Sequence, residues 1–335
     1  MKLNDLTKLF ENFNHLKILV IGDVMIDAYI WGKVERISPE APVPILSKSK
    51  KENRLGGAAN VALNIQSLGA TPILCSVIGN DAKATIFMDL LQNLNMPQNG
   101  IIKEDTRITT VKTRVIADKQ HLIRVDEEDD SAINYKLEKR FSEHIHQIIE
   151  TEKVDAIIFE DYDKGIITKK IIENTVDIAI KKNIPTLVDP KKRNFLSYNN
   201  VTVFKPNFKE FSEGLSLHIE KNNIEALQNS ATYFRERFDI KHLLLTLSEY
   251  GIFIASPKES HLLPTNVREV TDVSGAGDTV ISVASLCLAS GCTPLQMAAI
   301  ANLAGGIVCE RVGVVPVDKN RLLEEAMIFF EKNKF

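Results

Sequence analysis

The sequence predicts an α/β fold in which helices cover both faces of a mostly parallel central sheet. Short apolar runs rich in β-branched residues alternate along the chain with longer amphipathic stretches of helical period. This alternation is typical of parallel sheets, because each return to the same edge of the sheet requires a crossover that is usually a helix. In addition, 44% of the 335 residues are hydrophobic, which is enough for a large core.

Each element follows from its local pattern. Apolar runs of strand length predict strands at 17–21, 73–78, 156–159, 186–188, 201–205 and 243–246. Apolar residues at helical spacing predict helices at 58–68, 82–94, 135–150, 169–182, 224–238, 276–289 and 294–310. Because the chain shows no internal repeat or linker, we expect a single domain over residues 1–335.

Two segments, 29–48 and 107–125, break the alternation because they contain strand-like runs with no helix between them. In the second segment, alternating Thr109 to Val115 and a return through 122–125 are typical of a hairpin. We expect these segments to form a small β lid, inserted in the main domain, that covers the open end of the sheet and excludes water. The alternative is an edge hairpin that does not move.

The charge balance excludes several classes of function. The chain has 41 basic and 44 acidic residues, a net charge of −3, so no global field favours nucleic acid or an anionic membrane. The N-terminal residues 1–16 lack the apolar core of a secretory signal, and no apolar run approaches the ~20 residues that span a bilayer. The four cysteines show no metal or C-x-x-C spacing, which predicts buried free thiols. We expect a soluble cytoplasmic protein.

The most informative segment reads T-D-V-S-G-A-G-D-T-V from Thr271 to Val280. The small residues Gly275, Ala276 and Gly277 expose successive amides at a helix start, which can hold an anion. The carboxylate of Asp278 would repel a bound phosphate unless it takes a proton from an incoming nucleophile. We interpret the segment as a phosphoryl-transfer site with Asp278 as general base. The alternative is an ordinary turn with an acidic first-turn residue, and neither a Walker A nor a dinucleotide pattern occurs in the chain.

Two further segments are candidates to bind a polyhydroxy substrate. Asp23 and Asp27 follow the first predicted strand, at the end where open α/β sheets bind ligands. Gly56, Gly57 and Asn60 open the next helix, where glycine allows close approach and the amide both donates and accepts. Either aspartate could instead cap a turn, and the glycines could form an ordinary loop ending.

Asn207 and Glu210 lie one helical turn apart at a predicted helix start, and both are oxygen ligands suited to Mg²⁺ through its waters. Glu210 could also be a plain first-turn acid. Basic residues at the same end of the sheet are candidates to neutralise phosphates, although any one of them could be a solvated surface charge. These residues are Lys164, Lys191, Arg114 and Arg124.

Taken together, these segments resemble the ribokinase (PfkB) family of sugar kinases. G-G-A-A-N at 56–60 resembles its first signature, N-x-x-E at 207–210 its metal-linked motif, and D-V-S-G-A-G-D at 272–278 its second signature. Within the family, further motifs resemble the D-glycero-β-D-manno-heptose 7-phosphate kinases. These motifs are G-D-V-M-I-D at 22–27, R-I-S-P-E-A-P-V-P at 36–44, I-R-V-D at 123–126, D-Y-x-K-G at 161–165, D-P-K at 189–191 and T-x-S-E-x-G at 246–251.

The resemblance implies a ribokinase-like fold and the transfer of phosphate from ATP, with Mg²⁺, to the anomeric hydroxyl of heptose 7-phosphate, a step of lipopolysaccharide biosynthesis. It implies Asp278 as base and Gly275, Ala276 and Gly277 as anion hole, with Asn207 and Glu210 in the Mg²⁺ region. It assigns the sugar to Asp27, Gly56, Gly57 and Asn60, and its 7-phosphate to Lys164, Arg114 and Arg124. It assigns the nucleotide to Lys191, Asn207, Thr246, Ser248, Gly251, Asn302 and Gly306. It also implies a homodimer formed through the lid, and leaves a monovalent cation open.

The chain departs from the heptose kinases at two positions, Ala28 and Leu247, where those enzymes often have arginine. Both changes remove positive charge from regions where phosphates are expected. Nothing in the chain resembles the H-x-G-H motif of the nucleotidyltransferase to which such kinases are often fused, so we expect a stand-alone or excised kinase. The alternatives are a kinase for another sugar or sugar phosphate, and a non-catalytic protein that senses a ligand on the same fold.

Overall fold

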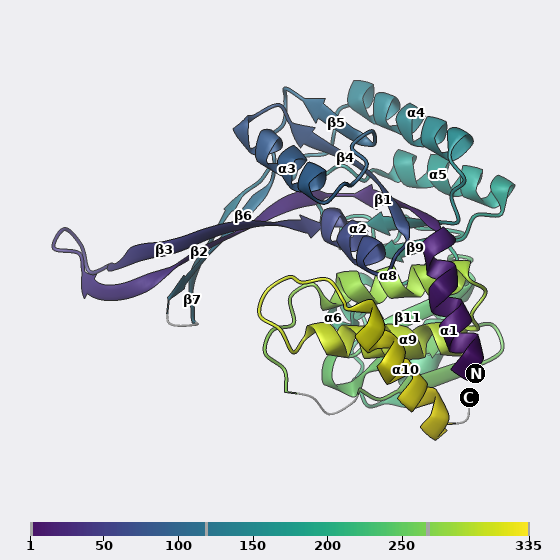
Figure 1. The fold of residues 1–335 in the computed structure, drawn as a ribbon. Coiled ribbons are helices and arrows are strands. Elements are labelled where there is room, and N and C mark those ends of the chain that lie inside the picture. The colour runs from purple at the N-terminus through teal and green to yellow at the C-terminus, as the bar shows by residue number, and fades with distance from the viewer. Residues whose placement is uncertain (1–2, 118–119, 266–268, 334–335) are drawn as a thin grey trace.

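A computed structural model describes residues 3–117, 120–265 and 269–333 (Figure 1). The main sheet has the strand order β13-β12-β11-β10-β9-β8-β1-β4-β5. Strands β11 to β5 in this order are parallel to their neighbours, whereas β12 and β13 run antiparallel at one edge. The strands are β1 (Lys17–Gly22), β4 (Thr71–Gly79), β5 (Ile101–Glu104), β8 (Ala156–Glu160), β9 (Thr186–Asp189), β10 (Val203–Phe204), β11 (His242–Thr246), β12 (Ile252–Ala255) and β13 (Ser260–Leu263).

The helices form a layer on each face of this sheet. One layer consists of α1 (Leu3–Asn12), α2 (Ala58–Ser67), α3 (Ala82–Asn93), α8 (Ala276–Ala289), α9 (Pro294–Val308) and α10 (Lys319–Asn333). The other consists of α4 (Tyr135–Thr151), α5 (Lys169–Lys182), α6 (Phe208–Gly214) and α7 (Ile224–Arg237). Strand β1 shows why two cores exist, because Ile18 and Val20 pack into the first and Leu19 and Ile21 into the second. The predicted α/β fold class is confirmed.

The bounds of α5 and α8 agree with the sequence expectation, and Thr168 and Asn134 show why α5 and α4 begin where they do. Each side chain accepts a hydrogen bond from the third amide of its helix. The sequence analysis did not predict α1 and α10, which lie side by side near the two ends of the chain (Figure 1). It also missed β5, β12 and β13, which are only four residues long.

A second sheet projects from the body and has the order β3-β2-β6-β7 (Figure 1). Its strands are β2 (Val24–Ile37), β3 (Pro44–Gly57), β6 (Val111–Ala117) and β7 (Gln120–Glu127). The predicted hairpin is present, since β6 and β7 pair antiparallel with Thr113 opposite Val125. The first segment is longer than the expected 29–48, because the chain leaves the main sheet at Asp23 and enters β2 immediately. Asp27, Gly56 and Gly57 therefore belong to strands of this sheet rather than to turns of the body. We call the sheet the lid, and its motion stays a prediction.

Candidate active site

The carboxylate of Asp278 lies in the first turn of α8 and is buried, with 5% of the residue exposed. Both of its oxygens accept hydrogen bonds, from Asn60 Nδ2 at 2.6 Å and from the Tyr162 hydroxyl at 2.8 Å. Burial raises the pKa of Asp278 above that of a free aspartate, and the bonds from Asn60 and Tyr162 only partly oppose this. The arrangement fixes the orientation of the carboxylate and makes it a better proton acceptor.

The start of α8 presents amide groups beside this carboxylate. Gly275 precedes the helix with φ of +78°, a left-handed conformation that glycine adopts without strain. The Ala276 amide donates to the Val273 carbonyl at a long 3.3 Å. Within the described residues, the amides of Gly275, Gly277 and Asp278 have no acceptor. Such first-turn amides bind anions, so the geometry is compatible with the predicted anion hole.

Three buried carboxylates meet beside the start of α8. Oxygens of Glu160, Asp189 and Asp278 all lie within 4.8 Å of one another. The buried ammonium of Lys205 pairs with Asp189 at 2.7 Å, whereas neither oxygen of Glu160 has a hydrogen-bond partner in the described part of the chain. Burial, together with Asp189 and Asp278, raises the pKa of Glu160 well above its usual range. A buried carboxylate without a partner, beside two others, fits a divalent cation because Mg²⁺ prefers oxygen ligands.

Asn207 and Glu210, the residues predicted to face Mg²⁺, form a capping box at the start of α6. Each side chain accepts a hydrogen bond from the other residue's amide at 2.8 Å. The second oxygen of Glu210 binds Lys191 Nζ at 2.6 Å, and this ammonium lies 3.8 Å from Asp189. Although burial opposes it, the carboxylates of Asp189 and Glu210 raise the pKa of Lys191. The motif therefore positions Lys191 beside the buried acids, and the metal role of Asn207 and Glu210 stays a prediction.

The residues predicted to hold the sugar lie where the lid joins the body. Gly56 has no room for a side chain, because a Cβ atom there would collide with the carboxylate of Asp27. Gly57 has φ of +60° and is followed directly by α2, which carries Asn60. Because Asn60 donates to Asp278, this junction and the start of α8 form one connected site.

Each cation predicted to bind the substrate phosphate has an acidic partner. Arg114 pairs with Asp27, and Lys164 pairs with Glu128 at 2.9 Å. Arg124 lies opposite Arg114 in the lid and pairs with Asp126 on the same strand, β7, at 2.9 Å. A phosphate in this region would have to share these cations with carboxylates. Their role in phosphate binding stays a prediction.

The predicted nucleotide residues lie at the end of β11 and on α9. Thr246 forms an isolated parallel bridge with Asn207, which brings two of them together. Asn302 donates to the carbonyls of Leu263 and Pro264 at 3.3 and 3.0 Å, and so ties α9 to the segment after β13. The others lie in the turn after β11 and on α9: Ser248, Gly251 and Gly306. At the two departures from the heptose kinases, Ala28 and Leu247 are both buried, and the Leu247 side chain belongs to the core.

Asp23 fixes the loop that contains Tyr162. Its carboxylate is fully buried and accepts hydrogen bonds from the amides of Tyr162, Lys164 and Ile166, at 2.8, 3.1 and 3.3 Å. These bonds fix the loop after β8, which contains Tyr162, the residue whose hydroxyl donates to Asp278. The alternative that Asp23 stabilises a turn is therefore the better description of its contacts.

Replacing Asp23 with asparagine is expected to change how stability depends on pH. Burial, and then Asp161, raise the pKa of Asp23 to about 6, whereas an unfolded aspartate titrates near ~3.9. Between these values the folded protein holds a proton that the unfolded chain has lost, so this residue lowers stability as pH rises. In the variant this pH dependence is absent. Its free energy of unfolding is also lower by about 1–3 kcal/mol, because one amide is left without an acceptor. In urea unfolding, the loss of free energy of unfolding in Asp23→Asn, relative to the wild type, should be larger at pH 4 than at pH 7. An equal loss at both pH values would contradict the assignment.

Sequence reasoning gave no role to Glu160, Tyr162, Asp189 and Lys205, although it quoted the segments that contain most of them. A signal existed, since all four lie at or just after the carboxyl ends of β8, β9 and β10. Strand ends alone could not rank them. Their significance depends on burial and on contacts with Asp278, both of which are tertiary properties.

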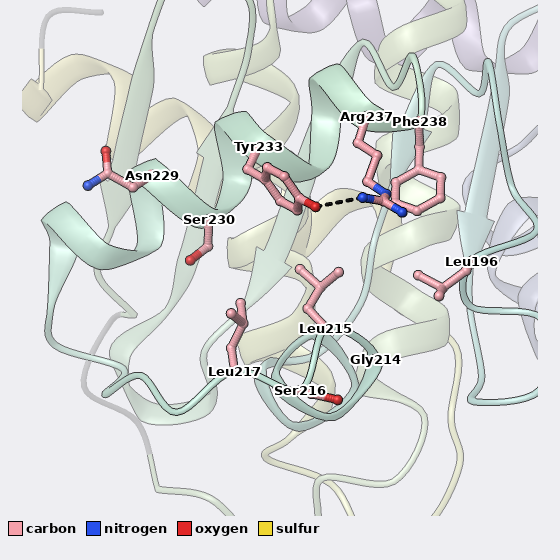
Figure 2. Close-up of a pocket in the computed structure, with 10 residues that line it drawn as sticks. All are labelled: Leu196, Gly214, Leu215, Ser216, Leu217, Asn229, Ser230, Tyr233, Arg237 and Phe238. Carbon is pink, nitrogen blue, oxygen red and sulfur yellow. Dashed lines mark hydrogen bonds between the residues drawn. The ribbon is translucent and has the colours of Figure 1, made fainter.

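A surface pocket of about 490 Å³ lies elsewhere, between α6 with its following loop and α7 (Figure 2). Within it, Arg237 donates to the hydroxyl of Tyr233 at 2.7 Å. The pocket contains none of the residues described above. Its lining consists of Leu196, Gly214, Leu215, Ser216, Leu217, Asn229, Ser230, Tyr233, Arg237 and Phe238.

Comparison with known proteins connects this geometry to a family. The model of the pfkB family carbohydrate kinase matches residues 15–320. The bifunctional protein HldE of Helicobacter hepaticus is 37% identical over 308 residues, which cover 92% of this chain and 63% of that protein. HldE of Pelobacter propionicus is 37% identical over 320 residues, covering 95% and 64%. The chain thus spans under two thirds of the length of these relatives.

Solved structures show the same fold. Phosphofructokinase-2 from Escherichia coli in complex with potassium has a TM-score of 0.77 at 18% identity, with 94% of this chain and 99% of that chain covered. In the described residues, no helix is long and apolar enough to cross a membrane. From the family match, the extent of identity and the shared fold, this chain belongs to the pfkB family and is an ATP-dependent carbohydrate kinase.

Proposed function

We propose that this kinase phosphorylates the anomeric C1 hydroxyl of D-glycero-β-D-manno-heptose 7-phosphate to give the 1,7-bisphosphate, in ADP-heptose biosynthesis for the lipopolysaccharide core. Identity of 37% with two HldE proteins and the heptose kinase motifs support the substrate. The observation that carries the reaction type is that buried, doubly hydrogen-bonded Asp278 lies beside amides at the start of α8 that have no acceptor in the described residues.

In this proposal each part of the site has one task. Asp278 takes the proton of the attacking hydroxyl, while Asn60 and Tyr162 hold its carboxylate in place. The amides of Gly275 and Gly277 receive the negative charge that develops on the transferred phosphoryl group. The lid, whose strands β2 and β3 meet the body at Val24 and Gly57, excludes water from the acceptor sugar.

Glu160 and Asp189 are the residues that would hold Mg²⁺, since their oxygens lie together and those of Glu160 have no other partner in the described structure. The ion would supply positive charge to the phosphates of ATP. This assignment leaves Asp278 free to act on the proton. It also adds residues that the sequence analysis did not consider as metal ligands.

Incubation with ATP, Mg²⁺ and a panel of heptose 7-phosphate, fructose 6-phosphate and ribose tests the substrate. Phosphorus NMR of the heptose product should show a new signal coupled to the anomeric proton. A preference for an unphosphorylated sugar would contradict the heptose assignment and leave a pfkB kinase of another sugar. Stabilisation by a sugar phosphate without ADP formation would instead favour the ligand sensor.

We also propose that two copies associate through the lid, because its strands expose apolar side chains that a second copy could cover. Ile123 on β7 is 59% exposed, and Ile37 and Val125 on the same sheet are also exposed. Ile123→Asp is expected to shift the protein from dimer to monomer in sedimentation velocity. The matched control is Ile328→Asp, at an exposed isoleucine on α10 in the body, which should leave the mass unchanged. A wild-type monomer, or a dimer that survives Ile123→Asp, would argue against this interface.

A further inference from the structure

The corner between α8 and α9 brings two cysteines together. Helix α8 ends at Ala289, and Gly291, two residues further on, has φ of +80° and closes a Schellman motif. The Cys292 amide donates to the Cys287 carbonyl, and the Gly291 amide to the Leu288 carbonyl, each at 3.0 Å. In this motif, the side chains of the two residues that the longer-range bond joins frequently contact each other. Here both positions are cysteine.

The two thiols differ in environment. Cys287 is fully buried in the core, whereas Cys292 is partly exposed. The neighbouring Cys287 side chain lowers the pKa of Cys292, although the partial burial of Cys292 opposes this. The Cys292 side chain, together with burial, raises the pKa of Cys287. An accessible thiol of lowered pKa beside a second thiol is the arrangement typical of cysteines that react with oxidants.

Another cysteine provides an internal contrast. Cys75 is buried in β4, and burial raises its pKa to about 12, so this thiol is unreactive. The five-residue spacing of Cys287 and Cys292 matches no common redox or metal motif, which is why the sequence predicts only free thiols. The close approach comes from the helix ending and not from a local sequence pattern.

We propose that Cys287 and Cys292 form a redox-active dithiol that hydrogen peroxide converts into an intramolecular disulfide. The Cys292 thiolate attacks a peroxide oxygen, the O–O bond breaks, and Cys292 becomes a sulfenic acid as water leaves. The Cys287 sulfur then attacks the Cys292 sulfur, an S–S bond forms, and a second water leaves. Two thiols are oxidised by two electrons, and one hydrogen peroxide is reduced to two waters.

The test uses the whole reduced chain, treated with hydrogen peroxide, blocked with an alkylating reagent and mapped by peptide mass spectrometry. A peptide pair linked through Cys287 and Cys292, lighter by two hydrogen atoms, is expected before Cys75 or Cys309 changes. Dithiothreitol should return both thiols. In Cys287→Ala, the sulfenic acid should persist at Cys292 and be trapped by dimedone, and in Cys292→Ser the link and the trapped adduct should both be absent.

Two results would overturn the proposal. One is that Cys287 and Cys292 are both still fully alkylated, and therefore not oxidised, after a peroxide treatment that already oxidises Cys309. The other is a sulfenic acid on Cys292 that persists in the wild-type chain as long as in Cys287→Ala, because Cys287 would then not resolve it. Neither result depends on kinase activity. Cys292→Ser keeps a side chain of similar size at a partly exposed position, and circular dichroism checks that Cys287→Ala, at a buried position, stays folded.

Discussion

Replacing Asp278 with asparagine is expected to lower kcat by at least about 10²–10⁴-fold while ATP binding persists, because general base assistance is lost. Asparagine keeps the size of the side chain and can still accept one bond from Asn60 or Tyr162, so the structure around α8 should survive. Steady-state kinetics with the best sugar of the panel, together with ATP titration by calorimetry, measure both quantities.

The matched control is Asp177→Asn, the same chemical change at an exposed position on α5, which should leave kcat unchanged. In the wild type, kcat should fall as pH falls through the pKa of Asp278, because protonation removes the acceptor. Burial raises this pKa, so the fall should begin at a higher pH than for a free aspartate. A loss of only a few-fold in Asp278→Asn would remove Asp278 from the role of base.

Replacing Lys205 with methionine is expected to destabilise the protein by about 3–5 kcal/mol, the usual cost of removing one partner of a buried ion pair. Lys205 is 2% exposed and pairs with Asp189 at 2.7 Å. Its ammonium also faces Glu160, whose oxygens lie within 4.8 Å of those of Asp189 and Asp278. Without it, a cluster of buried carboxylates loses its nearest positive charge. Urea unfolding at pH 7 measures the loss.

A double-mutant cycle separates the ion pair from simple packing. Adding Asp189→Asn to Lys205→Met should recover part of the stability, because the buried negative charge is removed together with its partner. Lys209→Met, at an exposed lysine of α6, is the matched control and should change stability by less than about 0.5 kcal/mol. Additive losses in the double variant would mean that Lys205 and Asp189 do not depend on each other.

The sequence predicted the fold class and the position of α8 because these depend on local patterns. Residues 276–289 carry an apolar run after small residues, and the structure begins and ends the helix at those residues. Short edge strands such as β12 and β13 escaped prediction, since four residues carry little periodicity and their pairing is set by the neighbouring strand. The lid was foreseen as a layer, but its extent to Val24 and Gly57 depends on pairing between distant segments.

The sequence by itself determined the family, through contiguous motifs such as 272–278. It also placed Asp278 in the first turn of α8. Only the tertiary structure decided how Asp278 is held, because Asn60 and Tyr162 come from α2 and from the loop after β8. It also decided that Asn207 and Glu210 cap a helix while Glu160 and Asp189 lie beside Asp278. The physical reason is that parallel strands end at one edge of the sheet, so residues more than a hundred positions apart share one buried, low-dielectric site. Burial and hydrogen bonding there, neither of which is encoded in a local pattern, shift the pKa values of these side chains and fix their orientation.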